Sequence, residues 1–298
     1  MANYNSKMLP ISLILISGSG CTLIFITRAL GFAAGADIGE QTGRLYFESL
    51  NPTQIAYAGF AVFASTLALW SRSPLWVRAI LIVQCAIAAL LMVDAASRGP
   101  LVALVLSFGF IAWSQKRFLL LALLLMAGAV LALFVSDSSL VLVDRLTTSG
   151  VDQSSIERLE FIQSNFLTAI ENPLFGAAYV DPVSQNYPHL TVLESAVAIG
   201  VGGAALMLFI QWRMLLDGLW LGKHRDLLMT MMVIAVLVQA YLSGSIWQSA
   251  DFWAVAGLSS AWVTAARRSQ HHMLHHAPAG GMPHPAGTQA ESTLSPQQ

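Results

Sequence analysis

The chain has 298 residues, of which 56% are hydrophobic and only 10% are charged, and its formal net charge is −1. Soluble domains carry roughly 25% charged residues, so this composition, together with a mean hydropathy of +0.64, indicates an integral membrane protein. Binding of nucleic acid through bulk positive charge is excluded, because the basic residues cluster only at the ends of apolar runs.

Apolar runs of the length needed to cross a bilayer recur along the chain. A spanning helix needs roughly 20 mainly apolar residues, and eight segments meet or approach that: about 9–31, 54–71, 75–95, 99–115, 118–136, 191–215, 227–247 and 251–266. Pro74, Pro100 and Pro188 stand at the beginnings of runs, where a helix tolerates proline. We therefore predict an all-α, polytopic membrane protein with about eight transmembrane helices in a domain over residues 1–266.

The distribution of lysine and arginine predicts the orientation of these helices. Basic residues concentrate in cytoplasmic loops, and most of them here fall in alternate loops, which places both chain ends in the cytoplasm of a bacterial inner membrane. The residues concerned are Lys7, Arg72, Arg78, Lys116, Arg117, Arg213, Lys223, Arg225, Arg267 and Arg268.

The one long polar stretch before the C-terminal tail, residues 137–190, lies between the fifth and sixth predicted spans and is expected in the periplasm. Connections longer than about 12–15 residues are uncommon unless they are functional or disordered. Apolar residues recur at nearly helical spacing from Gln153 to Ile170, so we expect an amphipathic helix that lies on the membrane surface or caps a cavity. Ser154 or Ser155 can cap its start, and Asn172–Pro173 ends it.

The C-terminal segment 267–298 is rich in polar residues, glycine and proline without an apolar period, so we predict a disordered cytoplasmic tail. Four histidines there have metal-ligand spacing, but a flexible tail offers no preformed site. Both cysteines, Cys21 and Cys85, fall inside apolar runs and read as small buried hydrophobes. We predict no metal site and no cofactor.

Residues capable of chemistry gather on the predicted periplasmic side. His189 is the histidine expected there, immediately before the sixth span, and an imidazole can accept a proton from a hydroxyl near neutral pH. Arg44, Arg98, Arg145 and Arg158 are expected on the same side, and forked guanidinium groups suit phosphate or pyrophosphate. Two interpretations stay open: a base with phosphate-binding arginines, or arginines that pair with acidic neighbours. Those neighbours are Asp94, Asp144, Glu157 and Glu160.

Several short motifs follow one another along the chain: Ser97–Arg98–Gly99, Ser155–Ile156–Glu157–Arg158, Asn172–Pro173–Leu174–Phe175–Gly176, and Tyr187–Pro188–His189 followed by the glycines from 200 to 203. In this order they resemble the "SRG" signature, the loop elements and the histidine element of the O-antigen ligase and O-antigen polymerase superfamily. Gly43–Arg44 is similar to a weaker upstream feature. Three positions depart from the family pattern: Leu190, Ala198 and Ala178, the last of which stands where the family has the second glycine of a GxG element.

The resemblance implies a metal-independent, inverting glycosyltransferase of the periplasmic face. Its donor would be an undecaprenyl-pyrophosphate-linked glycan, with His189 as general base and Arg98, Arg158 and, more weakly, Arg44 and Arg145 at the pyrophosphate. The acceptor would be another lipid-linked repeat in a polymerase of O-antigen or exopolysaccharide, or the lipid A core in a ligase. Membrane lipids and other polysaccharide-assembly proteins are the expected partners, and nucleic acid is not.

A different class stays open, namely a non-catalytic component or a transporter in lipid-linked glycan export. Charges inside the spans would favour transport, and the predicted spans contain few acidic residues. Glu194, one turn inside the sixth span, is the exception.

Overall fold

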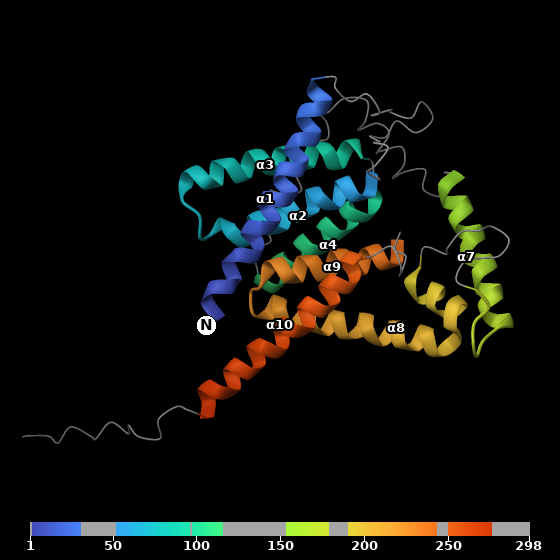
Figure 1. Ribbon diagram of the computed structural model, residues 1–298. Helices are drawn as coiled ribbons and strands as arrows, with labels where there is room; N and C mark the ends of the chain where they lie inside the picture. Colours follow the sequence, from blue (N-terminus) through green and yellow to red (C-terminus); the bar gives the residue numbers. More distant parts are fainter. Residues whose placement is uncertain are drawn as a thin grey trace, which may run out of the picture.

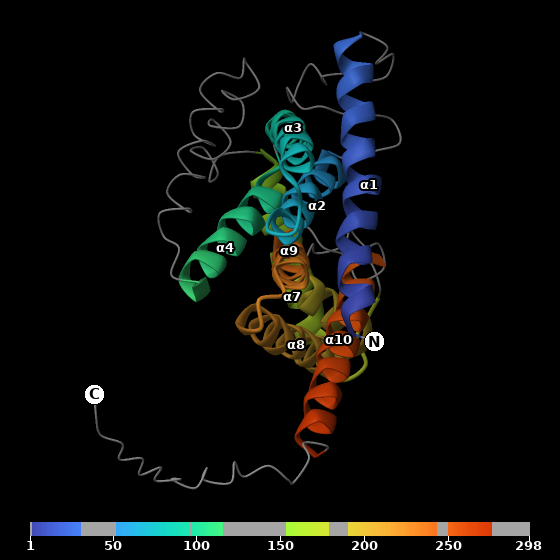
Figure 2. The same cartoon turned by 90° about the vertical axis from the view of Figure 1, so that its left-hand side faces the viewer.

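The computed structural model describes residues 2–30, 52–95, 97–115, 153–178, 190–242 and 250–275, and these ranges form helices joined by turns (Figures 1 and 2). In chain order they are α1 (Ala2–Ala29), α2 (Pro52–Trp70), α3 (Leu75–Asp94), α4 (Arg98–Gln115), α7 (Gln153–Glu171), α8 (Thr191–Lys223), α9 (Leu227–Leu242) and α10 (Ala250–His275). The all-α prediction is confirmed. The expected span 118–136 lies outside the described residues.

Within the described ranges, four helices are long and apolar enough to cross a bilayer, in α1, α2, α3 and α8. Two shorter apolar helices, Arg98–Trp113 and Leu227–Leu242, coincide with the predicted fourth and seventh spans. The protein is thus a polytopic membrane protein, as predicted.

Two predicted boundaries differ from the structure. α8 continues to Lys223, beyond the expected end at 215, so Arg213 lies inside a helix and not in a loop. α10 runs to His275, so residues 267–275 are helical where the sequence predicted a disordered tail. The stretch from 267 to 275 contains neither proline nor glycine, and a helix can continue through polar residues until such a breaker occurs. An apolar run in the sequence therefore predicts where the membrane-spanning part of a helix ends, but it does not predict where the helix itself ends.

α9 is the central helix of the bundle. It packs against α2, α4, α8 and α10, and residues such as Met231 and Val233 are almost fully buried. One core cluster joins Phe60 of α2 and Ala103 of α4 to α9, and another joins α8 and α10 to it through Met207 and Phe252. α1 packs on α2 and α3 at the side of the bundle.

The two ends of the bundle have different chemistry. The α2–α3 and α8–α9 turns lie at one end, on the left of Figure 1. Arg78 there lies over the Trp70 ring at 5.5 Å, and Arg267 lies over Trp220 at 5.6 Å. Tryptophan with basic residues is typical of a membrane–water interface. At the other end lie the C-termini of α3 and α9, the start of α4 and helix α7.

The α8–α9 turn is held by one acidic residue. Asp226 caps α9 because its Oδ1 accepts a hydrogen bond from the backbone N–H of Met229 at 3.3 Å. Burial raises the pKa of Asp226, although the Met229 N–H, a hydrogen bond with Trp262 and the charge of Arg72 act in the opposite direction. Asp226 therefore connects the α8–α9 turn to the α2–α3 turn and to α10.

Candidate functional site

The turn before α4 presents Arg98 at the end of the bundle opposite the Arg72 and Arg78 turn. Ser97 is buried, and its hydroxyl lies 3.4 Å from the hydroxyl oxygen of Thr53 in the first turn of α2. Arg98 is half-buried and begins α4, followed by Gly99 and Pro100. Ser97 thus holds the turn to α2, and Arg98 follows it as the first residue of α4, at the end of the bundle and not in its middle.

Helix α7 confirms the amphipathic helix predicted in the long loop, over nearly the same residues. Its inner face contacts α8, and Asn165 on that face is fully buried. Leu159, Phe166 and Ile170 form a separate apolar stripe that is exposed by 66%, 56% and 58%. The inner and apolar stripes are distinct, so α7 docks on the bundle with one face and leaves a second apolar face for lipid.

Arg158 projects from α7 to the end of α9. Its Nη1 donates a hydrogen bond to the backbone carbonyl of Leu242 at 3.2 Å. The last carbonyls of a helix lack intrahelical partners and carry negative partial charge, so a guanidinium group is favoured there. Arg158 is exposed, and this contact uses one of the five N–H donors of a guanidinium group. α9 packs along α4, and the start of α4 and the end of α9 lie at the same end of this pair (Figure 1). Arg98 is the first residue of α4, and Leu242, which accepts the hydrogen bond of Arg158, is the last residue of α9.

Helix α8 is not a straight rod. Its backbone leaves the helical region at Ile199 (φ −138°, ψ 19°) and at Gly200 (φ 74°, ψ −164°). A straight helix of 33 residues would be about 50 Å long, well beyond the roughly 30 Å of a bilayer core. The break divides it into residues 191–198 and 201–223, and the second segment alone is long enough to cross.

The loop after α7 fills this break with main-chain hydrogen bonds. The N–H of Val201 donates to the carbonyl of Pro173 at 2.7 Å, and the N–H of Ala177 donates to the carbonyl of Val197 at 2.8 Å. Interrupted helices expose backbone groups that must find other partners inside a membrane protein. The Pro173–Ala177 loop supplies them, so it ties α7 to the break in α8.

Two glycines make this close contact possible. Gly176 and Gly200 both have positive φ, at 71° and 74°, which side chains disfavour. A Cβ on Gly176 would lie 2.5 Å from the carbonyl oxygen of Val197, and one on Gly200 would lie 2.4 Å from that of Leu174. Each glycine thus faces the backbone of the other segment. We call these contacts between residues 173–177 and 197–201 the glycine joint.

The first segment of α8 folds back along the second. Nε2 of Gln211 donates a hydrogen bond to the hydroxyl of Thr191 at 2.6 Å across 20 residues of sequence. Nearer the break, a Cβ on Gly203 would lie 2.6 Å from the carbonyl oxygen of Ser195. These pairings correct the prediction of one continuous span over 191–215. The break at a glycine was not anticipated because the hydropathy of the run is uninterrupted.

Several predicted site residues lie outside the described ranges. They are His189, Arg44 and Arg145, and their roles stay predictions. Leu190, which follows His189 in the chain, is half-buried and precedes the first turn of α8 with an extended backbone. The described residues contain no group of three or more His, Cys, Asp or Glu side chains able to hold a metal ion.

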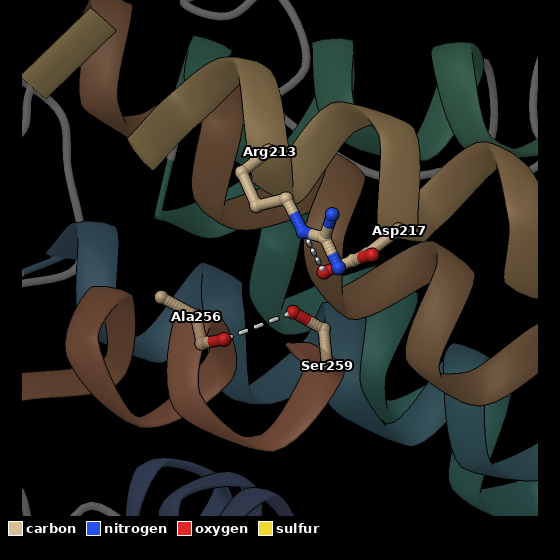
Figure 3. Close-up of polar contacts among 4 residues, drawn as sticks. All are labelled: Arg213, Asp217, Ala256 and Ser259. Carbon is tan, nitrogen blue, oxygen red and sulfur yellow. Dashed lines mark hydrogen bonds and ion pairs between the residues drawn. The ribbon is translucent and has the colours of Figure 1, made fainter. Parts of the chain in front are cut away.

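Sequence reasoning missed polar groups that the helices bury. Asp217 is 2% exposed and pairs with Arg213 at 3.3 Å, one turn earlier on α8 (Figure 3). Ser259 of α10 is fully buried. Its hydroxyl donates a hydrogen bond to the backbone carbonyl of Ala256 at 3.2 Å (Figure 3). Helix α8 therefore buries an acidic residue that the sequence analysis did not predict. The expected end of the span at 215 had placed Asp217 in a loop, and the i,i+4 spacing of Arg213 and Asp217 was the available signal.

The fold and the site are those of a polytopic helical membrane protein that has arginines and an interrupted helix at one end of its bundle. Residues 83–208 match a protein-family model described as O-Antigen ligase. This part of the chain is therefore similar to O-antigen ligases, in agreement with the family that the motifs indicated, and the similarity suggests a membrane enzyme of glycan transfer. Comparisons with curated proteins and with solved structures found no match.

Proposed function

We propose that this protein transfers glycan on the periplasmic face of the bacterial inner membrane from an undecaprenyl-pyrophosphate-linked donor, and that it polymerises O-antigen or exopolysaccharide repeats. The observation that carries the proposal is the extent of the family match. Its range, residues 83–208, contains Arg98, Arg158, His189 and both sides of the glycine joint. All the motifs that suggested the family lie within this range, except the weaker Gly43–Arg44 feature.

His189 is the proposed general base. It takes the proton of an acceptor hydroxyl while that oxygen bonds to the anomeric carbon of the donor sugar. The bond from this carbon to the pyrophosphate oxygen breaks with inversion, and undecaprenyl pyrophosphate leaves. Arg98 and Arg158, with Arg44 and Arg145 as further candidates, hold the pyrophosphate and stabilise the charge that develops on it. No metal or cofactor takes part.

The proposed orientation places both termini in the cytoplasm. The turns with Arg72, Arg78, Lys223 and Arg225 lie at one end of the bundle, in line with the excess of basic residues in cytoplasmic loops. Arg98 and α7 are at the other end, which is the proposed periplasmic one. The exposed apolar stripe of α7 then faces the outer leaflet.

The test is His189→Ala in cells that lack the chromosomal copy of the gene, with the membrane level of the full chain confirmed. We expect polymer to fall to about 1% of wild type or less, since general-base catalysis contributes 10²–10⁴-fold, and lipid-linked repeats to accumulate. His224→Ala is the matched control, because His224 stacks on Trp220 in the α8–α9 turn at the opposite end. Normal product in His189→Ala would contradict the proposal.

The same cells separate the two acceptors. A polymerase gives chains of graded length on the lipid carrier, and its loss leaves single repeats. If the acceptor is the lipid A core, loss leaves full-length polymer on the carrier and none on the core. If the protein is a transporter, its loss leaves the lipid-linked glycan on the cytoplasmic side. Labelling from the periplasm then no longer detects this glycan.

A further inference from the structure

Tyr57 presents a buried hydroxyl that the fold does not use. It lies in the second turn of α2, and its ring packs on the core cluster around Phe60 and Ala103. Its Oη is buried and has no hydrogen-bond partner among the described residues. Buried tyrosine hydroxyls usually have one, so this group calls for a ligand or another explanation.

The hydroxyl points at the turn that carries Arg98. A Cβ built on Gly99 would lie 3.4 Å from Oη, so the hydroxyl is in van der Waals reach of the residue next to Arg98. A larger side chain at position 99 would extend onto Oη. Glycine at position 99 therefore lets the Tyr57 hydroxyl lie against the first turn of α4.

A third helix completes the surroundings. The carboxylate of Asp251, in the first turn of α10, acts electrostatically on the Tyr57 hydroxyl. A tyrosine hydroxyl can donate one hydrogen bond and can also accept. The hydroxyl thus lies against the first turn of α4, which begins with Arg98, and within electrostatic range of the first turn of α10.

We propose that Tyr57 is a further substrate-binding residue, whose hydroxyl donates a hydrogen bond to a phosphate oxygen of the lipid-linked donor beside Arg98. This inference rests on the proposed function. A neutral hydroxyl donor next to a guanidinium group fixes the orientation of the bound phosphate. It adds no further positive charge, which would slow release of the pyrophosphate product. Substrate binding also explains why a membrane protein keeps an unused hydroxyl in its core.

The decisive variant is Tyr57→Phe, which removes Oη and keeps the ring. We expect the full-length protein in lipid nanodiscs to bind undecaprenyl pyrophosphate about tenfold more weakly or worse, because hydrogen bonds to charged groups are among the stronger ones. Without ligand, the variant should melt no lower than wild type, since no internal hydrogen bond is lost. Tyr241→Phe, an exposed tyrosine at the end of α9, is the matched control and should bind as wild type.

Each outcome separates this inference from the function on which it rests. If wild type binds the pyrophosphate lipid, Arg98→Ala weakens binding and Tyr57→Phe does not, the role of Tyr57 is wrong and the proposed function stands. If Tyr57→Phe lowers the melting temperature of the ligand-free protein and leaves affinity unchanged, the hydroxyl is structural and the inference is overturned. If wild type does not bind the lipid, the proposed function fails first.

Discussion

The Nε2 atom of Gln211 lies 2.6 Å from the hydroxyl oxygen of Thr191, although both belong to α8 and are separated by 20 residues. Both residues are buried, with exposed fractions of 4% and 1%. This contact fixes how far the first segment of α8 returns along the second. The chain segment that carries His189 therefore joins α8 beside a buried hydrogen bond and not at a free helix end.

Replacing Thr191 by valine should loosen this fold-back. The change keeps the shape of the side chain and leaves Gln211 Nε2 without its acceptor, which costs about 1–3 kcal/mol in a buried site. Gln211→Leu should remove the penalty in part, so the double variant should be more stable than the sum of the two single effects predicts. Unfolding of the full chain in detergent micelles measures all four proteins. Strict additivity would contradict the coupling.

Alanine at either glycine of the joint should abolish transfer and destabilise the protein. Gly176→Ala and Gly200→Ala each place a Cβ within 2.5 Å of backbone atoms of the opposite segment and force a side chain to positive φ. Gly202→Ala is the matched control, because no atom lies within 4 Å of its Cβ position. Membrane level, melting temperature and polymer yield should fall in the first two variants and stay near wild type in the third. Equal effects in all three would show that the joint has no special role.

The two roles of Arg158 can be separated by conservative and non-conservative substitution. Lysine can still donate to the Leu242 carbonyl and keeps its charge at the end of α9, but it cannot form the two parallel bonds of a guanidinium group. We expect Arg158→Lys to keep the melting temperature and lose most transfer. Arg158→Ala should also lose about 0.3–1 kcal/mol of stability through the helix end. Arg268→Ala, an exposed arginine on α10, provides the control. Full activity in Arg158→Lys would leave only the structural role.

Stability should depend on pH through Asp226. Because burial raises its pKa in the folded protein, the folded state holds the proton more tightly than the unfolded chain. The stabilisation is complete below the ordinary value of 3.8 and is lost as pH rises through the folded pKa. An asparagine side chain does not titrate, so Asp226→Asn should flatten this part of the profile while the cap is kept. Melting temperatures from about pH 3.5 to pH 7 test this, and parallel profiles for the two proteins would contradict it.

The sequence predicted the helices well because their signals are local. Length and hydropathy located α2 and α3 within a few residues, and helical spacing with an Asn172–Pro173 stop located α7 almost to the residue. Each of these depends on residues within one helix. The family motifs likewise pointed to Arg98, Arg158 and the two glycine-containing segments.

The contacts between distant segments could not be read in this way. Nothing in the hydropathy of 191–215 marks Gly200 as a break, since glycine is tolerated in spanning helices, and only the approach of residues 173–176 shows why it is there. The burial of Asp217 and of the Tyr57 hydroxyl depends on which helices pack beside them. Periodicity describes one helix at a time, whereas these features belong to pairs of helices.

The glycine joint is built from backbone atoms, and this has a consequence for how such a protein can vary. Leu174 and Phe175 sit inside the loop that fills the break, yet their side chains point outward and are exposed by 70% and 86%. The hydrogen bonds that hold the loop come from Pro173, Ala177 and their partners in α8. Substitutions at Leu174 and Phe175 can therefore change what the loop presents to the lipid without rebuilding the backbone contacts beneath them.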